Sequence, residues 1–121
     1  RSVFGGEFSP IQRFGTTPGV PTLPQGDQNK IMHMSLKILK ELVLHGTDAL
    51  KSMGQNLTQG NNFYIMLEVE SKEEAQKYYN ALSVGGKNEM PLQDTFWGAY
   101  FGSFTDKFGV QWMIDFEQTP Q

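Results

Sequence analysis

The sequence predicts an α+β protein built from two copies of a βαβββ module. Three observations support this prediction: a repeated segment, one well-marked helix between strands, and a hairpin near the C-terminal end. The repeat joins a glycine pair to an extended Pro-apolar-Gln segment. It occurs at Gly5-Gly6 with residues 10–12, and again at Gly85-Gly86 with residues 91–93. Reuse of one supersecondary unit within a chain is typical of a duplicated fold.

The first copy of the module is shorter than the second. A predicted strand and helix precede the second glycine pair, whereas only residues 1–4 precede the first pair, and the sequence does not begin with Met. We therefore expect that the first strand and most of the first helix of module 1 are absent from the printed sequence. Module 1 (partial) then covers residues 1–48, a polar connector covers 49–60, and module 2 covers 61–118, within a single domain of residues 1–121.

The clearest element is a helix that begins after Ser71. Ser71 and Glu74 have the spacing of a capping box, in which the hydroxyl accepts a hydrogen bond from the amide three residues later. Apolar residues then recur at helical spacing, at Ala75, Tyr78, Tyr79 and Leu82. The glycine pair that follows ends the helix, because glycine readily takes the left-handed conformation.

Strands are predicted on both sides of this helix. Residues 62–70 precede it and alternate between two faces, with Ile65 and Leu67 on one face and Tyr64, Met66 and Glu68 on the other. Three strands follow the helix, at residues 88–96, 99–105 and 110–117. Residues 106–109 predict the tight turn of a hairpin between the last two strands.

The first module shows the same final part. A strand is predicted from the glycine pair to about Phe14, followed by a loop at residues 15–29 that is rich in Thr, Pro, Gly and Asp. Residues 30–38 and 41–45 then predict a β-hairpin, because apolar and polar side chains alternate along residues 32–38.

Composition excludes several classes of function. The formal net charge of −3 with scattered basic residues gives no footprint for nucleic acid. The chain has no cysteine, which excludes disulfides, thiolate nucleophiles and cysteine-based zinc sites. No apolar run approaches the length of a membrane-spanning helix. We expect a cytoplasmic protein with neither a nucleic-acid nor a membrane partner.

Four segments carry a resemblance to a known family: residues 30–36, 90–98, 101–102 and 105–113. They are similar to PhnB-like proteins of the vicinal-oxygen-chelate, or glyoxalase/bleomycin-resistance, superfamily. The resemblance implies a glyoxalase-like fold, in which two βαβββ modules form a curved mixed sheet around a cup, and it implies a homodimer. Such proteins are often labelled 3-demethylubiquinone-9 3-methyltransferase. This chain lacks the glycine-rich strand-to-helix turn expected of a domain that binds adenosylmethionine.

The resemblance also implies where a metal would bind. Superfamily enzymes usually take ligands from the first strand of each module and from the last strand. By position, two of these ligands fall at Tyr64 and Met113, and neither suits a divalent metal. The ligand on the first strand of module 1 is not in the printed sequence. We therefore expect no conventional metal centre and no cofactor.

Candidate binding residues are those whose side chains are expected to line the cup. Five would supply contact area: Tyr64, Met66, Trp97, Phe101 and Met113. Five would orient a ligand: His33, Ser35, Glu68, Gln111 and Asp115. Each set also has a plainer interpretation. The aromatic and methionine side chains fit an ordinary core, the carboxylates fit a rim, and His33, like His45, fits a hydrogen-bonded structural histidine.

The sequence thus predicts a glyoxalase-like protein that binds a small, partly aromatic or oxygen-bearing molecule in the cup without a conventional metal. It names no catalytic residue. Two alternatives remain open. The first is an enzyme of the same superfamily, either a metal-dependent lyase or dioxygenase or the methyltransferase of the family label. The second is a structural dimerisation module with a filled cavity.

Overall fold

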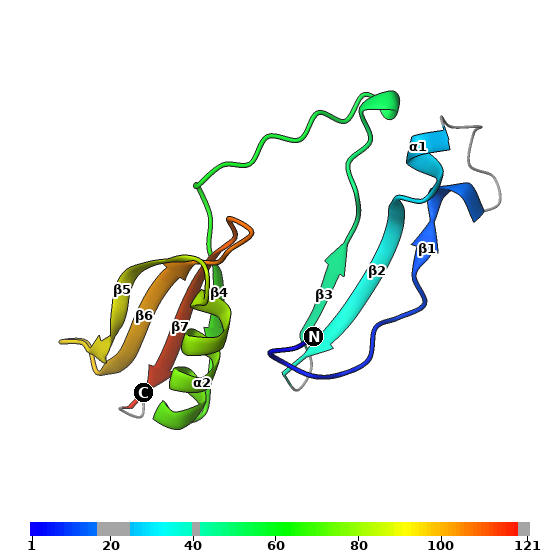
Figure 1. Ribbon diagram of the computed structural model, residues 1–121. Helices are drawn as coiled ribbons and strands as arrows, with labels where there is room; N and C mark the ends of the chain where they lie inside the picture. The colour runs from blue at the N-terminus through cyan, green and yellow to red at the C-terminus, as the bar shows by residue number, and fades with distance from the viewer. Residues whose placement is uncertain (17–24, 40–41, 119–121) are drawn as a thin grey trace. The chain divides into compact units, whose positions relative to one another are not determined.

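The computed structural model describes residues 1–16, 25–39 and 42–118. The chain divides into two compact units, Arg1–Thr58 and Gln59–Gln121 (Figure 1). Both contain strands and short helical segments, so the predicted α+β class is confirmed. The division into modules 1–48 and 61–118, joined by a connector within one domain, stays a prediction.

The second unit has the complete βαβββ order. Its elements are β4 (Ile65–Glu68), α2 (Lys72–Ser83), β5 (Lys87–Asp94), β6 (Ala99–Thr105) and β7 (Gln111–Glu117). They form a four-stranded sheet in the order β4-β7-β6-β5, with α2 along one face (Figure 1). The strand pair β4–β7 is parallel and the other two pairs are antiparallel. The helix is the connection that lets the chain leave β4 and return to the same sheet.

The predicted strands of this unit are present, and three of them are shorter or shifted at their ends. The strand predicted at 62–70 is confined to Ile65–Glu68, and the one predicted at 88–96 runs from Lys87 to Asp94. The latter ends early because a turn begins at Thr95. The Thr95 hydroxyl and amide both donate to the carbonyl of Ala99, at 2.8 and 2.9 Å.

One carboxylate organises the hairpin between β6 and β7. Asp106 Oδ1 accepts from the amides of Phe108 and Val110, at 2.9 and 3.0 Å. Asp106 Oδ2 accepts from the indole nitrogen of Trp112 at 2.9 Å. Gly109 has φ of +87°, which glycine adopts without strain. The tight turn predicted at residues 106–109 is therefore confirmed.

The helix α2 begins and ends where the sequence predicts. Ser71 Oγ accepts from the Glu74 amide at 3.0 Å, as the N-cap residue of a capping box does. Beyond the C-terminal end, Gly85 has φ of +77°. Ala75 and Tyr79 are buried against the sheet. The Tyr79 ring meets Phe104 edge-on, with ring centroids 4.9 Å apart.

The core of this unit lies between α2 and the sheet. Leu67, Phe104 and Ile114 are fully buried there. Gly102 lets the helix come close, because an added Cβ would lie 2.9 Å from the Tyr79 ring and 3.0 Å from the Leu92 amide nitrogen. The buried apolar residues of β4, β6 and β7 therefore face α2.

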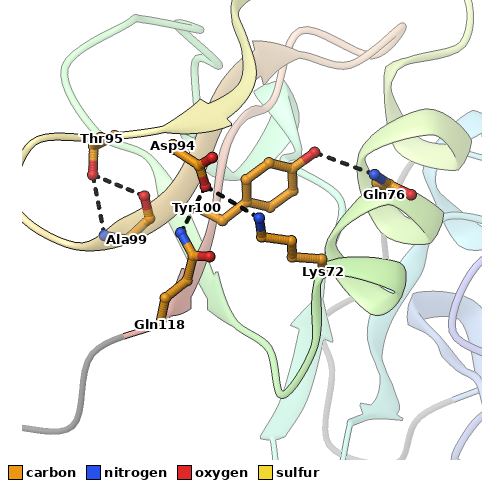
Figure 2. Close-up of polar contacts among 7 residues, drawn as sticks. All are labelled: Lys72, Gln76, Asp94, Thr95, Ala99, Tyr100 and Gln118. Atoms are coloured by element: carbon orange, nitrogen blue, oxygen red, sulfur yellow. Dashed lines mark hydrogen bonds and ion pairs between the residues drawn. The ribbon is translucent and has the colours of Figure 1, made fainter.

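A polar cluster joins the end of β5 to α2 and to the residue after β7 (Figure 2). Asp94 Oδ1 accepts from Gln118 Nε2 at 2.7 Å and lies 3.3 Å from the Lys72 ammonium. These contacts hold the pKa of Asp94 below its ordinary value, the Gln118 hydrogen bond first and Lys72 second. Gln76 Nε2 donates to the Tyr100 hydroxyl at 3.2 Å, and Lys72 lies over the Tyr100 ring. The cluster fixes the β5 end of the turn that carries Trp97.

The first unit contains a three-stranded antiparallel sheet in the order β1-β2-β3 (Figure 1). Its strands are β1 (Gln12–Arg13), β2 (Ile31–Ile38) and β3 (Leu42–Gly46). The short helical segments are η1 (Phe14–Thr16), α1 (Gln25–Gln28) and η2 (Lys51–Met53). The two strands predicted at 30–38 and 41–45 correspond to β2 and β3, although residues 40–41 lie outside the described residues.

Two expectations for this unit were wrong. The strand predicted up to Phe14 is reduced to Gln12–Arg13 and an isolated bridge between Phe8 and Leu36. The register shifts within β1, and Pro10 has no amide to donate to a ladder. The loop predicted at 15–29 contains α1, a helix of four residues, which is too short to give a periodic pattern. Residues 17–24 of that loop lie outside the described residues.

The core of the first unit is small. Ile38 and Leu50 are fully buried, and Phe14 and Leu36 are nearly so. Leu50 lies in the segment predicted as a connector, where its amide donates to Gln55 Oε1 at 2.9 Å. Within the described part of the chain, no helix is long and apolar enough to cross a membrane.

The N-cap of α2 gives the first prediction. Replacing Ser71 by Ala removes the acceptor for the Glu74 amide, so we expect the free energy of unfolding to fall by about 1 kcal/mol. Ser71→Asp keeps an acceptor at the N-cap and should remain close to the original protein. Urea unfolding followed by far-UV circular dichroism measures both. Ser83→Ala, at the other end of α2, is the control. Equal losses for the Ala and Asp variants at residue 71 would contradict the capping role.

Candidate functional site

The sheet of the second unit has one face against α2 and one face turned away from α2, which we call the open face. In β7, Trp112 and Ile114 point to the α2 side, and the alternate residues point to the open face, as the sequence predicts. The open face carries Tyr64, Met66, Glu68, Glu89, Phe101, Ser103, Thr105, Gln111, Met113 and Asp115.

Strand register brings several predicted residues into direct opposition on this face. Across the parallel pair β4–β7, Met66 lies opposite Met113 and Glu68 lies opposite Asp115. Across β6–β7, Phe101 is also opposite Asp115. Directly opposed side chains on one face of a sheet are in contact range. The open face therefore places an apolar pair beside a pair of carboxylates.

An aromatic pair lies at the β5–β6 end of the open face. Trp97 is in the turn between these strands, and its side chain is half exposed. Its ring meets Phe101 edge-on with centroids 6.0 Å apart. Phe96, also in the turn, meets Trp97 edge-on at 5.0 Å and is 98% exposed. The turn thus presents flat apolar surface to solvent.

A hydrogen-bonded trio extends across the open face from β4 to β5. The Tyr64 hydroxyl, just before β4, donates to Glu89 Oε2 at 2.7 Å, and the Thr105 hydroxyl donates to Glu89 Oε1 at 3.1 Å. The hydrogen bond to Glu89 raises the pKa of Tyr64 above its ordinary value. Tyr64 therefore stays a neutral phenol with a fixed orientation at physiological pH.

Glu89 is a site residue that the sequence prediction missed. The alternation of residues along a strand predicts which face each side chain points to only where the strand pairing is regular. The pairing of β5 with β6 shifts between Asn88 and Met90 and again before Gln93. Such bulges reverse the order of faces along a strand, and no pattern in residues 87–94 marks where they occur.

Asp115 is the most perturbed carboxylate of the open face. Its residue is 6% exposed. Burial, the neighbouring charge of Glu117, a hydrogen bond with Glu117 and the charge of Glu68 together raise the pKa of Asp115 to about 6. A carboxyl group with this pKa exchanges a proton readily near neutral pH. It can therefore act as donor or acceptor toward a bound molecule.

Gln111 is placed on the same face but is already engaged. Its side-chain amide donates to the carbonyl of Phe63 at 2.7 Å. This bond ties the start of β7 to the segment before β4. The carbonyl oxygen of the Gln111 side chain is the group left to face a ligand.

The donor set on the open face does not fit the metal centre that the family implies. At the two expected ligand positions stand a phenol that already donates to Glu89 and the thioether of Met113. Within residues 1–16, 25–39 and 42–118, no group of three or more His, Asp or Glu side chains is placed to hold a metal ion. The expected lack of a conventional centre stays a prediction.

The two remaining predicted residues, His33 and Ser35, lie on β2 in the first unit. His33 Nε2 is 3.0 Å from Nδ1 of His45, and the Ser35 amide donates to Ser9 Oγ at 2.8 Å. Their membership of a cup shared with the second unit stays a prediction. A cavity of about 180 Å³ on this sheet touches Ser35 and His45.

A larger cavity of about 630 Å³ in the first unit contains none of the predicted residues. It is lined by polar groups of α1 and of the segment after β3, among them Asp27, Lys30 and Ser52. Asp27 accepts from the Ser52 hydroxyl and lies 3.1 Å from the Lys30 ammonium. Its polar groups satisfy one another, so we assign no ligand to it.

Asp115 gives a prediction about pH. Its pKa is higher in the folded protein than in the unfolded chain, so folding takes up a proton between about pH 4 and pH 6. The contribution of Asp115 to stability is therefore complete below about pH 4 and is lost as the pH rises through about 6. We expect Asp115→Asn to raise the free energy of unfolding at pH 7.5 by about 1 kcal/mol and to change it little at pH 4.

Thermal unfolding of both proteins between these pH values measures the effect. Glu70→Gln, which replaces an exposed carboxylate outside the sheet, is the control. A stability gain that is as large at pH 4 as at pH 7.5 would contradict the assignment.

Comparison with known proteins identifies the family. Residues 22–114 match the family described as Glyoxalase/Bleomycin resistance protein/Dioxygenase superfamily. The Escherichia coli (strain K12) protein YjdN is 34% identical over 97 residues, which are 78% of this chain and 62% of YjdN. The match thus spans less than two thirds of the length of that curated relative.

Two solved structures are similar to this chain. Protein PA1353 from Pseudomonas aeruginosa is 38% identical, with a TM-score of 0.78 over 95% of this chain and 81% of PA1353. The PhnB protein from Bacillus cereus, whose name carries a provisional 3-demethylubiquinone-9 3-methyltransferase label, is 22% identical. Its TM-score is 0.69 over 95% of this chain and 83% of PhnB, which shows a shared fold. The resemblance to PhnB-like proteins is confirmed. This chain belongs to the Glyoxalase/Bleomycin resistance protein/Dioxygenase superfamily.

Proposed function

We propose that the protein binds a small, partly aromatic or oxygen-bearing molecule on the open face of the second unit, without a conventional metal centre. The observation that carries this proposal is the composition of that face. It combines uncovered apolar side chains with a buried carboxyl group whose pKa is about 6. Ligand sites are typically apolar with a few fixed polar groups.

The apolar part of the face suits a flat ligand. Trp97 and Phe101 form an edge-on pair, so one ring face of the pair stays free to stack. Met66 is about half exposed, and it lies opposite Met113. Methionine side chains adjust their shape to an irregular ligand. Together these groups provide contact area without specifying one molecule.

The polar part of the face would set the orientation of the ligand. Asp115 offers a proton below pH 6 and an acceptor above it. The hydroxyl of Tyr64 donates to Glu89, which leaves its oxygen to accept a hydrogen bond from a ligand. A ligand with one hydroxyl or carboxyl group beside an aromatic ring matches both parts of the face.

We also propose that the complete protein is a cytoplasmic homodimer that binds neither nucleic acid nor membrane. Large apolar side chains of the second unit other than those of the proposed ligand site, including Phe63, Val84 and Met90, are more than a third exposed, and exposed apolar patches often mark interfaces. The net charge of −3 argues against a polyanion partner. Light scattering after size-exclusion chromatography measures the oligomeric state.

An enzyme of the same superfamily is the second candidate, and Asp115 is the observation that favours it. A carboxyl group with a pKa of about 6 suits general acid–base work. Stoichiometric manganese, iron, nickel or zinc bound at the open face would favour a lyase or dioxygenase. Heat on titration with adenosylmethionine would favour a methyltransferase. We expect neither, because the donor set does not fit the first and the sequence shows no glycine-rich turn for the second.

The aromatic pair gives a prediction about binding. In a ligand-observed NMR screen of aromatic acids, phenols and ketones, we expect Trp97→Ala to weaken every hit at least about tenfold, because the stacking surface is lost. Tyr64→Phe removes only the hydroxyl and should weaken oxygen-bearing hits by a smaller factor. Phe108→Ala, which removes another exposed aromatic side chain in the turn between β6 and β7, is the control. Hits that respond to Phe108→Ala and not to Trp97→Ala would refute the open face as the site.

A further inference from the structure

We infer that the first unit carries a binding site for a divalent transition metal, formed by the imidazoles of His33 and His45. The site uses residues of the first unit alone and does not rest on the proposed function. It also differs from the family pattern, which takes ligands from both modules, because both histidines come from adjacent strands of one sheet.

The strand register places the two histidines on the same face of this sheet. His45 on β3 lies directly opposite Ser35 on β2. His33 precedes Ser35 by two residues, so its side chain points to the same face as that of Ser35. The two imidazoles are thus diagonal neighbours across an antiparallel pair. Their ring centroids are 5.3 Å apart and their planes are inclined by 34°.

The separation of the facing nitrogens suits two ligands on one metal ion. His33 Nε2 and His45 Nδ1 are 3.0 Å apart. Two imidazole nitrogens that bind one ion at about 2.0–2.1 Å and at a right angle are about 2.9 Å apart. A right angle is the geometry of neighbouring ligands in square-planar and tetragonal sites, which Cu²⁺ and Ni²⁺ prefer. The rings therefore need little movement to hold such an ion.

Metal binding by both rings requires a different tautomer in one of them. In the hydrogen bond of the pair, one of the two facing nitrogens carries the hydrogen. When that hydrogen sits instead on the outer nitrogen of the same ring, both facing nitrogens offer lone pairs to a metal ion.

Oxygen groups beside the pair can complete the coordination. Gln12 lies opposite His33 across β1–β2, and Ser35 lies opposite His45 across β2–β3. Opposed residues share a face, so both side chains accompany the imidazoles. Among the residues that the structure describes, no third His, Asp or Glu joins them to make a three-ligand group. We therefore expect a site of two protein nitrogens with the remaining positions open to water or to a small ligand.

The chemistry of the donors determines which ions fit. Imidazole suits copper, nickel and zinc, and sites of a given kind bind Cu²⁺ more tightly than Ni²⁺ or Zn²⁺. Mg²⁺ and Ca²⁺ prefer oxygen ligands. Binding should thus follow the order Cu²⁺ above Ni²⁺ and Zn²⁺, with Mg²⁺ and Ca²⁺ undetected.

Titration of the chelator-treated full chain with copper sulfate, followed by calorimetry, tests the site. We expect one ion per chain, and we expect His33→Gln and His45→Gln each to weaken binding at least about tenfold. Lys37→Gln is the matched control, since Lys37 lies on β2, is exposed, and points to the same face two residues beyond Ser35. Its affinity for Cu²⁺ should not change.

Electron paramagnetic resonance of the unsubstituted protein with Cu²⁺ gives a readout that does not depend on folding of the variants. The proposal expects hyperfine coupling to two equivalent nitrogens. Coupling to one nitrogen or to none would overturn it, as would unchanged Cu²⁺ affinity in both histidine variants. Lack of binding at about 1 mM Cu²⁺ would overturn it as well.

Discussion

The parallel pairing of β4 with β7 is the interaction on which the candidate site depends. These strands come from opposite ends of the second unit, with α2, β5 and β6 between them in the chain. Their register opposes Met66 to Met113 and Glu68 to Asp115. Without that register, Glu68 and Asp115 would not lie opposite each other. The pairing therefore provides both the Met66–Met113 pair and the charge of Glu68, which adds to the effects of burial and of Glu117 on the pKa of Asp115.

Packing against α2 explains why the two faces of the sheet differ. Leu67, Phe104 and Ile114 are fully buried on the α2 side. The open face does not pack against α2, so methionine, tyrosine and carboxylate side chains can lie on it together. The hydrophobic effect thus requires apolar residues on the face that packs against α2, whereas the other face can hold polar residues.

Much of the second unit could be predicted because its sequence signals are local. The N-cap at Ser71, the strands β6 and β7 and the turn after Thr105 all have signals that act over a few residues, and the structure confirms them. Glu89 could not be predicted, because a register shift in β5, between Asn88 and Met90, falls at this residue. The helix α1 was not predicted, because its four residues are too few to show a periodic pattern. Strand pairing over long distances leaves no local signal at all.

The two sheets also show how a repeated design can diverge. Ser35 opposes His45 in the first unit, as Ser103 opposes Met113 in the second. The backbone pairing is alike at both places, while the facing side chain is an imidazole in one and a thioether in the other. Two hairpins with the same backbone pairing thus present different side chains at corresponding positions.

The three hydrogen bonds of Asp106 have a consequence for how this sequence can change over evolution. They fix the pairing of β6 with β7, and a slip by one residue would exchange the directions of Ile114 and Asp115. A substitution on the open face changes one side chain at a time, whereas a substitution at residue 106 removes the hydrogen bonds that hold all of these side chains in register. Sequence change is therefore tolerated more easily on the strand surfaces than at Asp106.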